Sequence, residues 1–316
     1  MSALISVLQQ SLGIDAMSVR RIIATAPERY KVYSIPKRGG AGRRVIAQPA
    51  KEVKALQRIL LKTFLSDLPV HPSAFAYVPG KSIRTNAVTH VANGPILKMD
   101  FQNFFPSIRS YDWLSYCHDN GVFDSEADAR MASKILFRRE KGESILRLSI
   151  GAPSSPHVSN LLMYEFDRAI SDKVAEDYVT YTRYADDLTF SAERTGYLTR
   201  VEKDVRKTLR DLRYPRLFIN DRKTVLATTK YRREVTGLIL TNDHRVSLGR
   251  HKKRLLRAQI HRYSKGELNN IATAKLAGNM AFASDVEPTF YTRMERVFTK
   301  EVMDRLKDSV NRQDQS

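Results

Sequence analysis

The tetrapeptide Tyr184-Ala185-Asp186-Asp187 lies between two runs of strand-forming residues, 179–183 and 188–191. The β-branched and aromatic residues of these runs predict a β-hairpin whose tip carries two adjacent carboxylates. Adjacent carboxylates repel each other, and a bound divalent cation offsets that repulsion. Asp is also a common turn former, so the pair alone leaves an ordinary turn open as an alternative.

A third carboxylate stands at the end of another predicted strand. Residues 95–100 form a short apolar run that ends in Asp100 and continues into an aromatic turn, a pattern typical of a strand. A strand-end Asp beside a hairpin-tip pair can hold two Mg²⁺ ions about 3.5–4 Å apart, the separation that suits phosphoryl transfer. We therefore expect Asp100, Asp186 and Asp187 to form a catalytic metal site.

The charge of the chain indicates a polyanionic partner. It has 53 Lys and Arg residues against 34 Asp and Glu, a formal net charge of +19. The basic residues concentrate between Arg20 and Lys62 and between Arg245 and Lys275, on either side of the expected carboxylate site. Basic clusters that neutralise phosphates favour nucleic acid as the partner, although a merely solubilising surface is the alternative.

Other features of the sequence exclude several classes of protein. No apolar run approaches the roughly 18 residues of a membrane span, and the N-terminal residues lack the basic region of a signal peptide. We expect a cytoplasmic protein with no membrane partner. Cys117 is the single cysteine, which excludes internal disulfides and Cys-rich zinc sites.

Hydrophobic periodicity predicts an α+β fold. Helices are expected over 51–68, 159–174 and 250–263, with two further helical stretches after Asn269 and Thr289. Strands are expected near 95–100, 179–191 and 235–240. These elements predict an antiparallel sheet covered by helices on one side.

The order of the motifs resembles the palm of reverse transcriptases. The strand ending in Asp100, the segment Gly151-Ala152-Pro153-Ser154-Ser155-Pro156 and the later Tyr-Ala-Asp-Asp follow one another as they do in that family. The resemblance implies a right-hand α+β polymerase with fingers, palm and a small helical thumb. It divides the chain into N-terminal helices and fingers (1–94), palm with interleaved fingers segments (95–243) and a basic helical thumb (244–316).

The resemblance also implies the activity and its cofactors. The chain would be an RNA-directed DNA polymerase that uses dNTP substrates and two Mg²⁺ ions, which Mn²⁺ could replace. Phe101, next to Asp100, would join the metal site. Lys223, in Phe218-Ile219-Asn220-Asp221-Arg222-Lys223-Thr224, matches the motif in which a lysine protonates departing pyrophosphate, with a mobile surface lysine as the alternative.

Several further residues would bind the incoming nucleotide. Arg44 lies in a segment similar to the fingers motif that meets the triphosphate, and its guanidinium can hold phosphate oxygens with two parallel hydrogen bonds. Lys37 and Arg38, before Gly39-Gly40, would lie at the tip of the fingers and touch the same phosphates or the template, with an ordinary solvated turn as the alternative. Gly151 and Ala152 would let the backbone approach the nucleotide, although Ile150 stands where many relatives have Gln.

An aromatic residue is expected to select the sugar. Phe105 stands five residues after Asp100, where reverse transcriptases carry an aromatic ring beneath the sugar of the incoming nucleotide. The ring would leave no room for a 2′-hydroxyl and so would reject ribonucleotides. Phe104 holds this place if the turn is irregular.

Two short signatures resemble the retron branch of bacterial reverse transcriptases. They are the N-A-x-x-H element at Asn86–His90 and the V-T-G element at Val235–Gly237. This resemblance implies a cognate structured noncoding RNA of the msr-msd type as primer and template. Synthesis would start from a 2′-hydroxyl of an RNA guanosine and give branched RNA-linked single-stranded DNA (msDNA), in antiphage defence with an effector protein and in a higher-order complex. The residues expected to bind RNA are Asn86, His90, Val235, Thr236, Gly237, Arg250, Lys253, Arg254 and Arg257.

Two alternatives stay open. The chain could be another compact bacterial reverse transcriptase, of the intron or diversity-generating type. It could also be chiefly an RNA-DNA-binding scaffold that restrains a toxic effector. The three aspartates Asp100, Asp186 and Asp187 are all present, which weighs against a polymerase that has lost its activity.

Overall fold

The computed structural model describes residues 2–37 and 42–311, and it contains two compact units that interleave along the chain. The first unit consists of Met1–Pro79, Lys98–Thr189 and Tyr197–Val225. The second consists of Gly80–Leu97, Phe190–Gly196 and Leu226–Ser316. The predicted scheme of fingers, palm and thumb is a functional division, and it stays a prediction.

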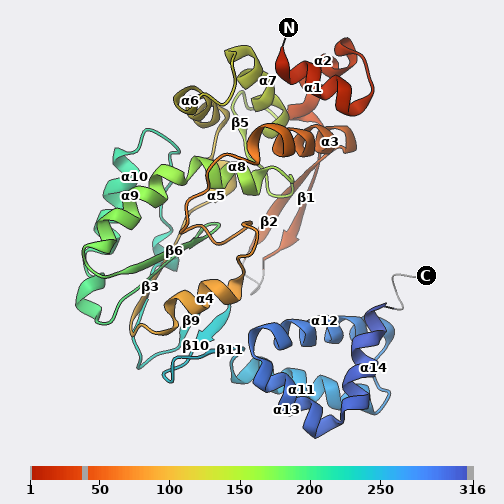
Figure 1. Ribbon diagram of the computed structural model, residues 1–316, viewed down its shortest axis with the longest axis vertical. Coiled ribbons are helices and arrows are strands. Elements are labelled where there is room, and N and C mark those ends of the chain that lie inside the picture. The colour runs from red at the N-terminus through yellow and green to blue at the C-terminus, as the bar shows by residue number, and fades with distance from the viewer. Residues whose placement is uncertain (1, 38–41, 312–316) are drawn as a thin grey trace. The chain divides into compact units, whose positions relative to one another are not determined.

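The first unit combines helices with short strands (Figure 1). Its helical elements are α1 (Ala3–Leu12), α2 (Ala16–Thr25), η1 (Ala26–Glu28), α3 (Lys51–Leu60), η2 (Leu61–Leu65), α5 (Phe104–Ser107), α6 (Ser110–Asn120), α7 (Glu126–Leu136), α8 (Ser155–Leu162), α9 (Tyr164–Ala175), α10 (Val201–Asp211) and η4 (Asp221–Lys223). Its strands are β1 (Tyr30–Pro36), β2 (Arg43–Pro49), β4 (Arg138–Arg139), β5 (Leu146–Arg147) and β6 (Thr180–Tyr184). The short helix η3 (Thr195–Leu198) and the strands β3 (Ile96–Asp100), β7 (Asp187–Ser191) and β8 (Val225–Ala227) run across the boundary between the units.

One four-stranded sheet carries the predicted carboxylates, with the strand order β6-β7-β3-β8. β6 and β7 are joined only through Ala185 and Asp186, as the hairpin prediction required. Helix α9 packs on β6, and α10 packs on α9. A separate antiparallel ribbon is formed by β1 and β2, whose register runs from Tyr30–Pro49 to Pro36–Arg43.

Three predicted elements differ from the observed ones, because the backbone leaves regular helix or strand geometry within them. The helix expected over 51–68 ends as an α-helix at Leu60 and continues as the π-helical turn η2. The helix expected over 159–174 is two helices that meet at Met163, whose ψ of −1° lies far from the helical value. The single strand expected over 235–240 is a hairpin of β9 and β10.

A buried ion pair connects the hairpin to the helices behind it. Arg183 on β6 and Asp167 on α9 have fully buried side chains, and Arg183 Nη2 lies 2.6 Å from Asp167 Oδ2. Arg183 Nε donates to Asp167 Oδ1 at 2.8 Å, and the Tyr181 hydroxyl donates to the same oxygen at 2.8 Å. Arg183 Nη1 also donates to Asn160 Oδ1 at 3.1 Å and to the carbonyl of Ala185 at 3.2 Å. The charged pair therefore fixes the turn that carries Asp186.

The second unit has one hydrophobic core, built from α4, a small sheet and four C-terminal helices (Figure 1). Its elements are α4 (Ile83–Val91), β9 (Arg233–Val235), β10 (Leu238–Leu240), β11 (Val246–Ser247), α11 (Arg250–Ser264), α12 (Asn270–Val286), α13 (Pro288–Phe298) and α14 (Lys300–Asn311). The two helical stretches expected after residue 269 are thus three helices. Within the described ranges no helix is long and apolar enough to cross a bilayer.

We predict that Arg183→Met destabilises the protein by about 3–5 kcal/mol, because it leaves the Asp167 carboxylate buried without a counter-charge. Urea unfolding of the purified variant measures this loss. The double variant Arg183→Met/Asp167→Leu should recover part of the stability, since the buried charge is gone. The DNA synthesis that the sequence leads us to expect should be reduced in both variants, because both lose the hydrogen bond to the carbonyl of Ala185. Full recovery of synthesis in the double variant would contradict this role of Arg183.

Candidate active site

The first unit brings the three predicted carboxylates together at one end of its sheet. Asp100 ends β3, Asp187 begins β7, and Asp186 stands in the turn before it. The Phe101 amide donates to the carbonyl of Asp186 at 3.1 Å, and the Asn220 amide donates to the carbonyl of Asp100 at 2.7 Å. Backbone hydrogen bonds therefore fix both Asp100 and Asp186 in place.

The carboxylates of this site influence one another's ionisation. Burial raises the pKa of Asp187 to about 6, and the charge of Asp186 and a side-chain hydrogen bond with Asp100 contribute in the same direction. Burial and the charge of Asp100 also raise the pKa of Asp186. The site thus concentrates negative charge that the protein alone does not neutralise.

Lys223 occupies a position beside this charge. Its Nζ lies 2.8 Å from Asp100 Oδ2, although 58% of the Lys223 side chain is exposed. Burial lowers the pKa of Lys223, but the hydrogen bond to Asp100 and the charges of the three aspartates together raise it above its usual value. The amine is therefore protonated at neutral pH, which a general acid requires.

The donor set at this site fits divalent metal. Among residues 2–37 and 42–311, no three His, Cys, Asp or Glu side chains already converge as a cation site. Carboxylate oxygens are nevertheless the ligands that Mg²⁺ prefers, and a cation would relieve the repulsion that raises the pKa values of Asp186 and Asp187. Phe101, also predicted at the metal site, has a buried side chain that stacks on Phe104 with ring centroids 5.6 Å apart, so only its backbone could serve there.

The predicted nucleotide-binding residues Arg44, Gly151 and Ala152 lie on or against β2. Arg44 is exposed on this strand, and its charge partly opposes the rise that burial and Asp100 cause in the pKa of Asp186, so it lies within electrostatic reach of that carboxylate. The Ala47 amide donates to the carbonyl of Ile150 at 2.8 Å, which holds the next residue, Gly151, against the strand. Gly151 has φ +114°, and a Cβ there would lie 3.1 Å from the carbonyl oxygen of Ala47, so both backbone angle and space require glycine.

The other predicted nucleotide contacts, Lys37, Arg38 and Ala152, differ in what the structure describes of them. Lys37 is exposed directly after β1. Arg38 lies outside the described residues. Ala152, the neighbour of Gly151, is buried, which leaves its backbone as the group that could face a nucleotide.

The two neighbouring phenylalanines have different environments. Phe104 is 3% exposed and stacks on Phe101, whereas Phe105 is half-buried and meets Phe104 edge to face at 5.2 Å. Phe105 is therefore the ring available to a substrate, and Phe104 is the core residue. This arrangement supports the predicted register of the sugar-selecting aromatic.

The V-T-G and N-A-x-x-H elements meet in the second unit. Val235 is fully buried, and Thr236 and Gly237 form the β9–β10 turn with φ of +48° and +84°. Two successive positive φ angles are typical of a tight hairpin turn, which explains the glycine. The Thr236 hydroxyl donates to the carbonyl of Ile83 at 3.2 Å, which ties this turn to α4, the helix that carries the other element.

The side chains of Asn86 and His90 require a correction. Both are 0% exposed, so neither presents a surface to RNA, and Val235 is buried in the same way. The Nδ1 atom of His90 lies 2.7 Å from the hydroxyl of Ser191. Burial lowers the pKa of His90 to about 3, which keeps the imidazole neutral. We assign these three residues to the support of the turn rather than to direct RNA contact.

The predicted basic helix corresponds to α11, but its cations fall into two groups. Lys253 Nζ lies 2.8 Å from Glu287 Oε1, and Lys252 Nζ lies 4.1 Å from the centroid of the Phe282 ring. Both lysines therefore contribute to packing on neighbouring helices. Arg250, Arg254 and Arg257 are exposed at spacings that place them on one side of the helix, and no carboxylate pairs with them in the described part of the chain. We call these three arginines the α11 stripe.

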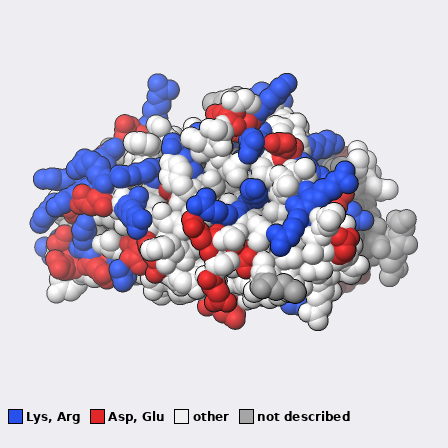
Figure 2. All heavy atoms as spheres, turned by 90° about the horizontal axis from the view of Figure 1, so that it is seen from above, with Lys and Arg blue, Asp and Glu red and all other residues white. Residues whose placement is uncertain are grey.

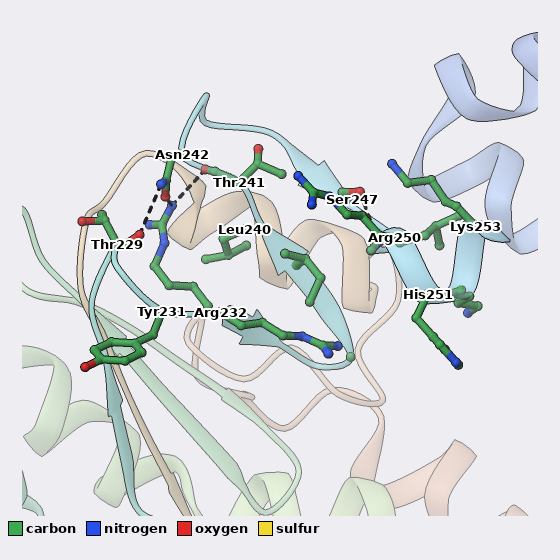
Figure 3. A pocket seen from close by; sticks show the side chains of 16 residues that line it. Thr229, Tyr231, Arg232, Leu240, Thr241, Asn242, Ser247, Arg250, His251 and Lys253 are labelled. Atoms are coloured by element: carbon green, nitrogen blue, oxygen red, sulfur yellow. Dashed lines mark hydrogen bonds between the residues drawn. The ribbon is translucent and has the colours of Figure 1, made fainter. Parts of the chain in front are cut away.

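Two hollows border the α11 stripe. A groove of about 620 Å³ contains Arg254, Arg257, His261 and Lys265 on one wall and Val297 and Phe298 on the other. A cavity of about 720 Å³ lies between the small sheet and the start of α11. Figure 3 shows Tyr231 and Arg232 on one side of this cavity and Arg250 and His251 on the other. Both hollows have cationic walls that suit phosphate groups.

Total charge does not single out one interface. Figure 2 shows Lys and Arg side chains in several clusters on one face, with Asp and Glu among them. Individual unpaired cations such as the α11 stripe locate a binding surface better than total charge does.

The residues that sequence reasoning missed are the ones that support the carboxylates. Arg183, Asp167 and Asn160 are buried and hold the catalytic turn from behind. The only signal in the sequence for this support is Arg183, a charged residue in the otherwise uncharged strand that ends at Tyr184. Alternation predicts which side of a strand such a residue occupies, but it does not reveal that this side is covered by α8 and α9.

Comparison with known proteins agrees with this geometry. The family described as reverse transcriptase (RNA-dependent DNA polymerase) matches residues 35–240. The Retron Ec83 reverse transcriptase of Escherichia coli is 37% identical over 280 residues, which cover 88% of this chain and 89% of that protein. The Retron Ec86 reverse transcriptase of Escherichia coli is 30% identical and covers 95% of this chain and 92% of that protein.

A solved structure is similar in fold. The apo telomerase of Candida tropicalis superposes with a TM-score of 0.50 at 13% sequence identity. The superposition covers 90% of this chain and 64% of the telomerase chain. At this identity the likeness supports the fold alone.

The chain belongs to the reverse transcriptase family and is an RNA-directed DNA polymerase. The α+β polymerase fold expected from the sequence is confirmed. Within that family it is a retron-type reverse transcriptase, because similarity to retron enzymes extends over nearly the whole chain. Its class uses dNTPs and divalent metal, and an RNA template is its partner.

We predict that Asp187→Asn reduces DNA synthesis by more than about 100-fold, since even groups that only orient metal ligands are worth roughly 10–100-fold. The protein should stay folded. The pKa of Asp187 is raised in the folded state, so this group makes the metal-free protein less stable as pH rises from about 4 to 6. The variant should lack that decline. Primer extension and urea unfolding at several pH values test both points, with exposed Asp172→Asn as control, and near-normal extension would refute the assignment.

We predict that Phe105→Ala relaxes sugar selection. The vacated space admits a 2′-hydroxyl, so the preference for dNTP over rNTP should fall by at least about tenfold, the scale on which pockets separate ligands that differ by one small group. Single-nucleotide incorporation measures the ratio. Phe104→Ala should instead lower stability by about 3–5 kcal/mol, as expected for a core ring. Relaxed selection in Phe104→Ala with none in Phe105→Ala would move the role by one residue.

Proposed function

We propose that the chain reverse transcribes a cognate structured noncoding RNA of the msr-msd type. In this proposal the RNA is both primer and template, and synthesis starts from a 2′-hydroxyl of one RNA guanosine. The product is branched RNA-linked single-stranded DNA (msDNA). The observation that carries the proposal is the link between the two retron signatures, because the Thr236 hydroxyl of V-T-G is bonded to the helix that carries N-A-x-x-H.

The residues of the first unit have distinct roles in the proposed reaction. Two Mg²⁺ ions, when bound by Asp100, Asp186 and Asp187, would stabilise the charge on the attacking and leaving oxygens. Mn²⁺ is the alternative ion. Arg44 orients the triphosphate with its guanidinium, Lys37 adds positive charge at the same end, and Phe105 excludes the 2′-hydroxyl. The Gly151 backbone lies against β2, and in this proposal it borders the nucleotide together with the backbone of Ala152.

Lys223 supplies the proton in this scheme. Its Nζ starts protonated, 2.8 Å from Asp100, and 58% exposure of the side chain leaves it free to turn toward the departing pyrophosphate. A general acid of this kind contributes roughly 10²–10⁴-fold. The motif resemblance and the contact with Asp100 support this role.

The second unit recognises the RNA in this proposal. Thr236 and Gly237 lie at the surface in the β9–β10 turn, and the α11 stripe supplies three exposed arginines beside two cationic hollows. Phosphate contacts position nucleic acid, and the shape of a turn or cavity adds selectivity. The wider role in antiphage defence with an effector protein, in a higher-order complex, is part of the same proposal, and the cytoplasmic location stays a prediction.

We predict that Arg254→Gln/Arg257→Gln weakens RNA binding and lowers its log-log salt slope by about two units, one for each lost phosphate contact. The matched control is Arg130→Gln/Arg168→Gln, which also removes two exposed charges, but from helices of the first unit where each arginine pairs with a glutamate of its own helix. The control should retain the salt slope. Self-primed synthesis should fall much more than extension of an excess of annealed generic primer-template. Equal losses in both assays would favour general duplex holding over cognate recognition.

Isolation of the protein with its nucleic acid tests the proposed product. After digestion of the RNA, the proposal predicts one discrete DNA species with a branched RNA remnant. Heterogeneous unbranched DNA would favour another compact reverse transcriptase. Bound RNA without DNA, from a protein whose Asp100, Asp186 and Asp187 are intact, would favour the scaffold that restrains an effector.

A further inference from the structure

Tyr77 has an unusual backbone conformation close to the catalytic turn. Its φ is +62°, in the left-handed region that bulky L-residues rarely adopt. Hydrogen bonds fix the residues before it, because the Phe75 amide donates to the carbonyl of Arg183 at 2.8 Å and Asn160 Nδ2 donates to the carbonyl of Ala76 at 2.9 Å. The surrounding structure therefore holds Tyr77 in a conformation that a free chain avoids.

The same buried groups hold the turn that carries Asp186. Arg183 Nη1 donates to Asn160 Oδ1 at 3.1 Å and to the carbonyl of Ala185 at 3.2 Å. A continuous chain of hydrogen bonds thus runs from Ala76, next to Tyr77, through Asn160 and Arg183 to Ala185. Ala185 also has a left-handed φ, of +56°. Two strained positions at one site, held by one network, indicate a local geometry that function requires.

The backbone at Tyr77 is held by its neighbours, but the side chain is not packed in the core. It is 52% exposed, and no hydrogen bond or ring contact of this side chain occurs among the residues that the structure describes. Its hydroxyl lies within electrostatic reach of Asp186, Tyr184 and Arg44. The side chain therefore lies near both the group proposed to bind the triphosphate and a carboxylate proposed to bind metal, and a core packing role does not explain it.

We propose that Tyr77 is a positioning residue whose ring stacks on the base pair formed between the template and the incoming nucleotide. Every base has an aromatic face, so a stacking platform aligns all four nucleotides without selecting among them. Because the backbone at Tyr77 is held by its neighbours, it limits where the ring can lie relative to Asp186. This inference rests on the proposed roles of Arg44 and Asp186.

Three substitutions at Tyr77 separate the ring, the hydroxyl and the backbone. Tyr77→Phe keeps the ring, Tyr77→Ala removes it, and Tyr77→Gly removes it while relieving the left-handed backbone. Steady-state incorporation on an annealed primer-template gives KM for dNTP and kcat, and thermal unfolding gives stability. Loss of one base-aromatic stack corresponds to about 5–150-fold in affinity.

The expected pattern has three parts. Tyr77→Phe should behave as the unmodified protein, and both Tyr77→Ala and Tyr77→Gly should raise KM for dNTP by about 5–150-fold with kcat nearly unchanged. Tyr77→Gly should melt at the same or a higher temperature, so its defect is not a folding defect. An unchanged KM in Tyr77→Gly, a fall in kcat alone, or an equal loss in Tyr77→Phe would overturn the inference.

Asp186→Asn separates this inference from the site on which it rests. If Asp186→Asn retains synthesis, the proposed catalytic site is wrong. If Asp186→Asn is inactive while Tyr77→Gly keeps an unchanged KM, the site stands and the role of Tyr77 alone fails.

Discussion

The buried ion pair between Arg183 and Asp167 is the interaction on which the catalytic geometry depends. Removing two charges from water costs several kcal/mol per ion, and the structure offsets this cost with a bidentate contact and with bonds to Tyr181 and Asn160. The ion pair fixes the position of the turn that carries Asp186. Arg183 holds the carbonyl of Ala185, and the turn that presents Asp186 cannot shift without breaking a charged pair in the interior.

The carboxylates in front of this pair are organised in the opposite way. Burial and mutual repulsion raise the pKa values of Asp186 and Asp187, so the site is destabilising by itself and favourable for a cation. Lys223 meets part of the negative charge through Asp100. The buried Arg183–Asp167 pair thus supports a strained and negatively charged site. Such an arrangement is expected where the binding energy of metal and substrate is used for catalysis.

The sequence predicted what depends on local pattern. The hairpin around Asp186, the strand ending in Asp100 and the start of α11 at Arg250 all follow from periodicity and turn chemistry. It could not predict what depends on tertiary packing. Polar residues such as Asn86 and His90 ordinarily face water, yet here α4 packs with that side inward. Thr299 ends α13 with φ +68°, at a position where glycine is the usual residue. Without that glycine the sequence does not indicate that α13 and α14 are two helices rather than one.

We propose that Asp100, Asp186 and Asp187 together hold two catalytic divalent ions. Mn²⁺ binding measured by electron paramagnetic resonance, with an annealed primer-template and an unreactive dNTP analogue present, tests it most directly. The account predicts two bound Mn²⁺ ions per chain, loss of at least one of them in Asp186→Asn, and no change in exposed Asp172→Asn. Two Mn²⁺ ions retained at unchanged affinity in Asp186→Asn would contradict it.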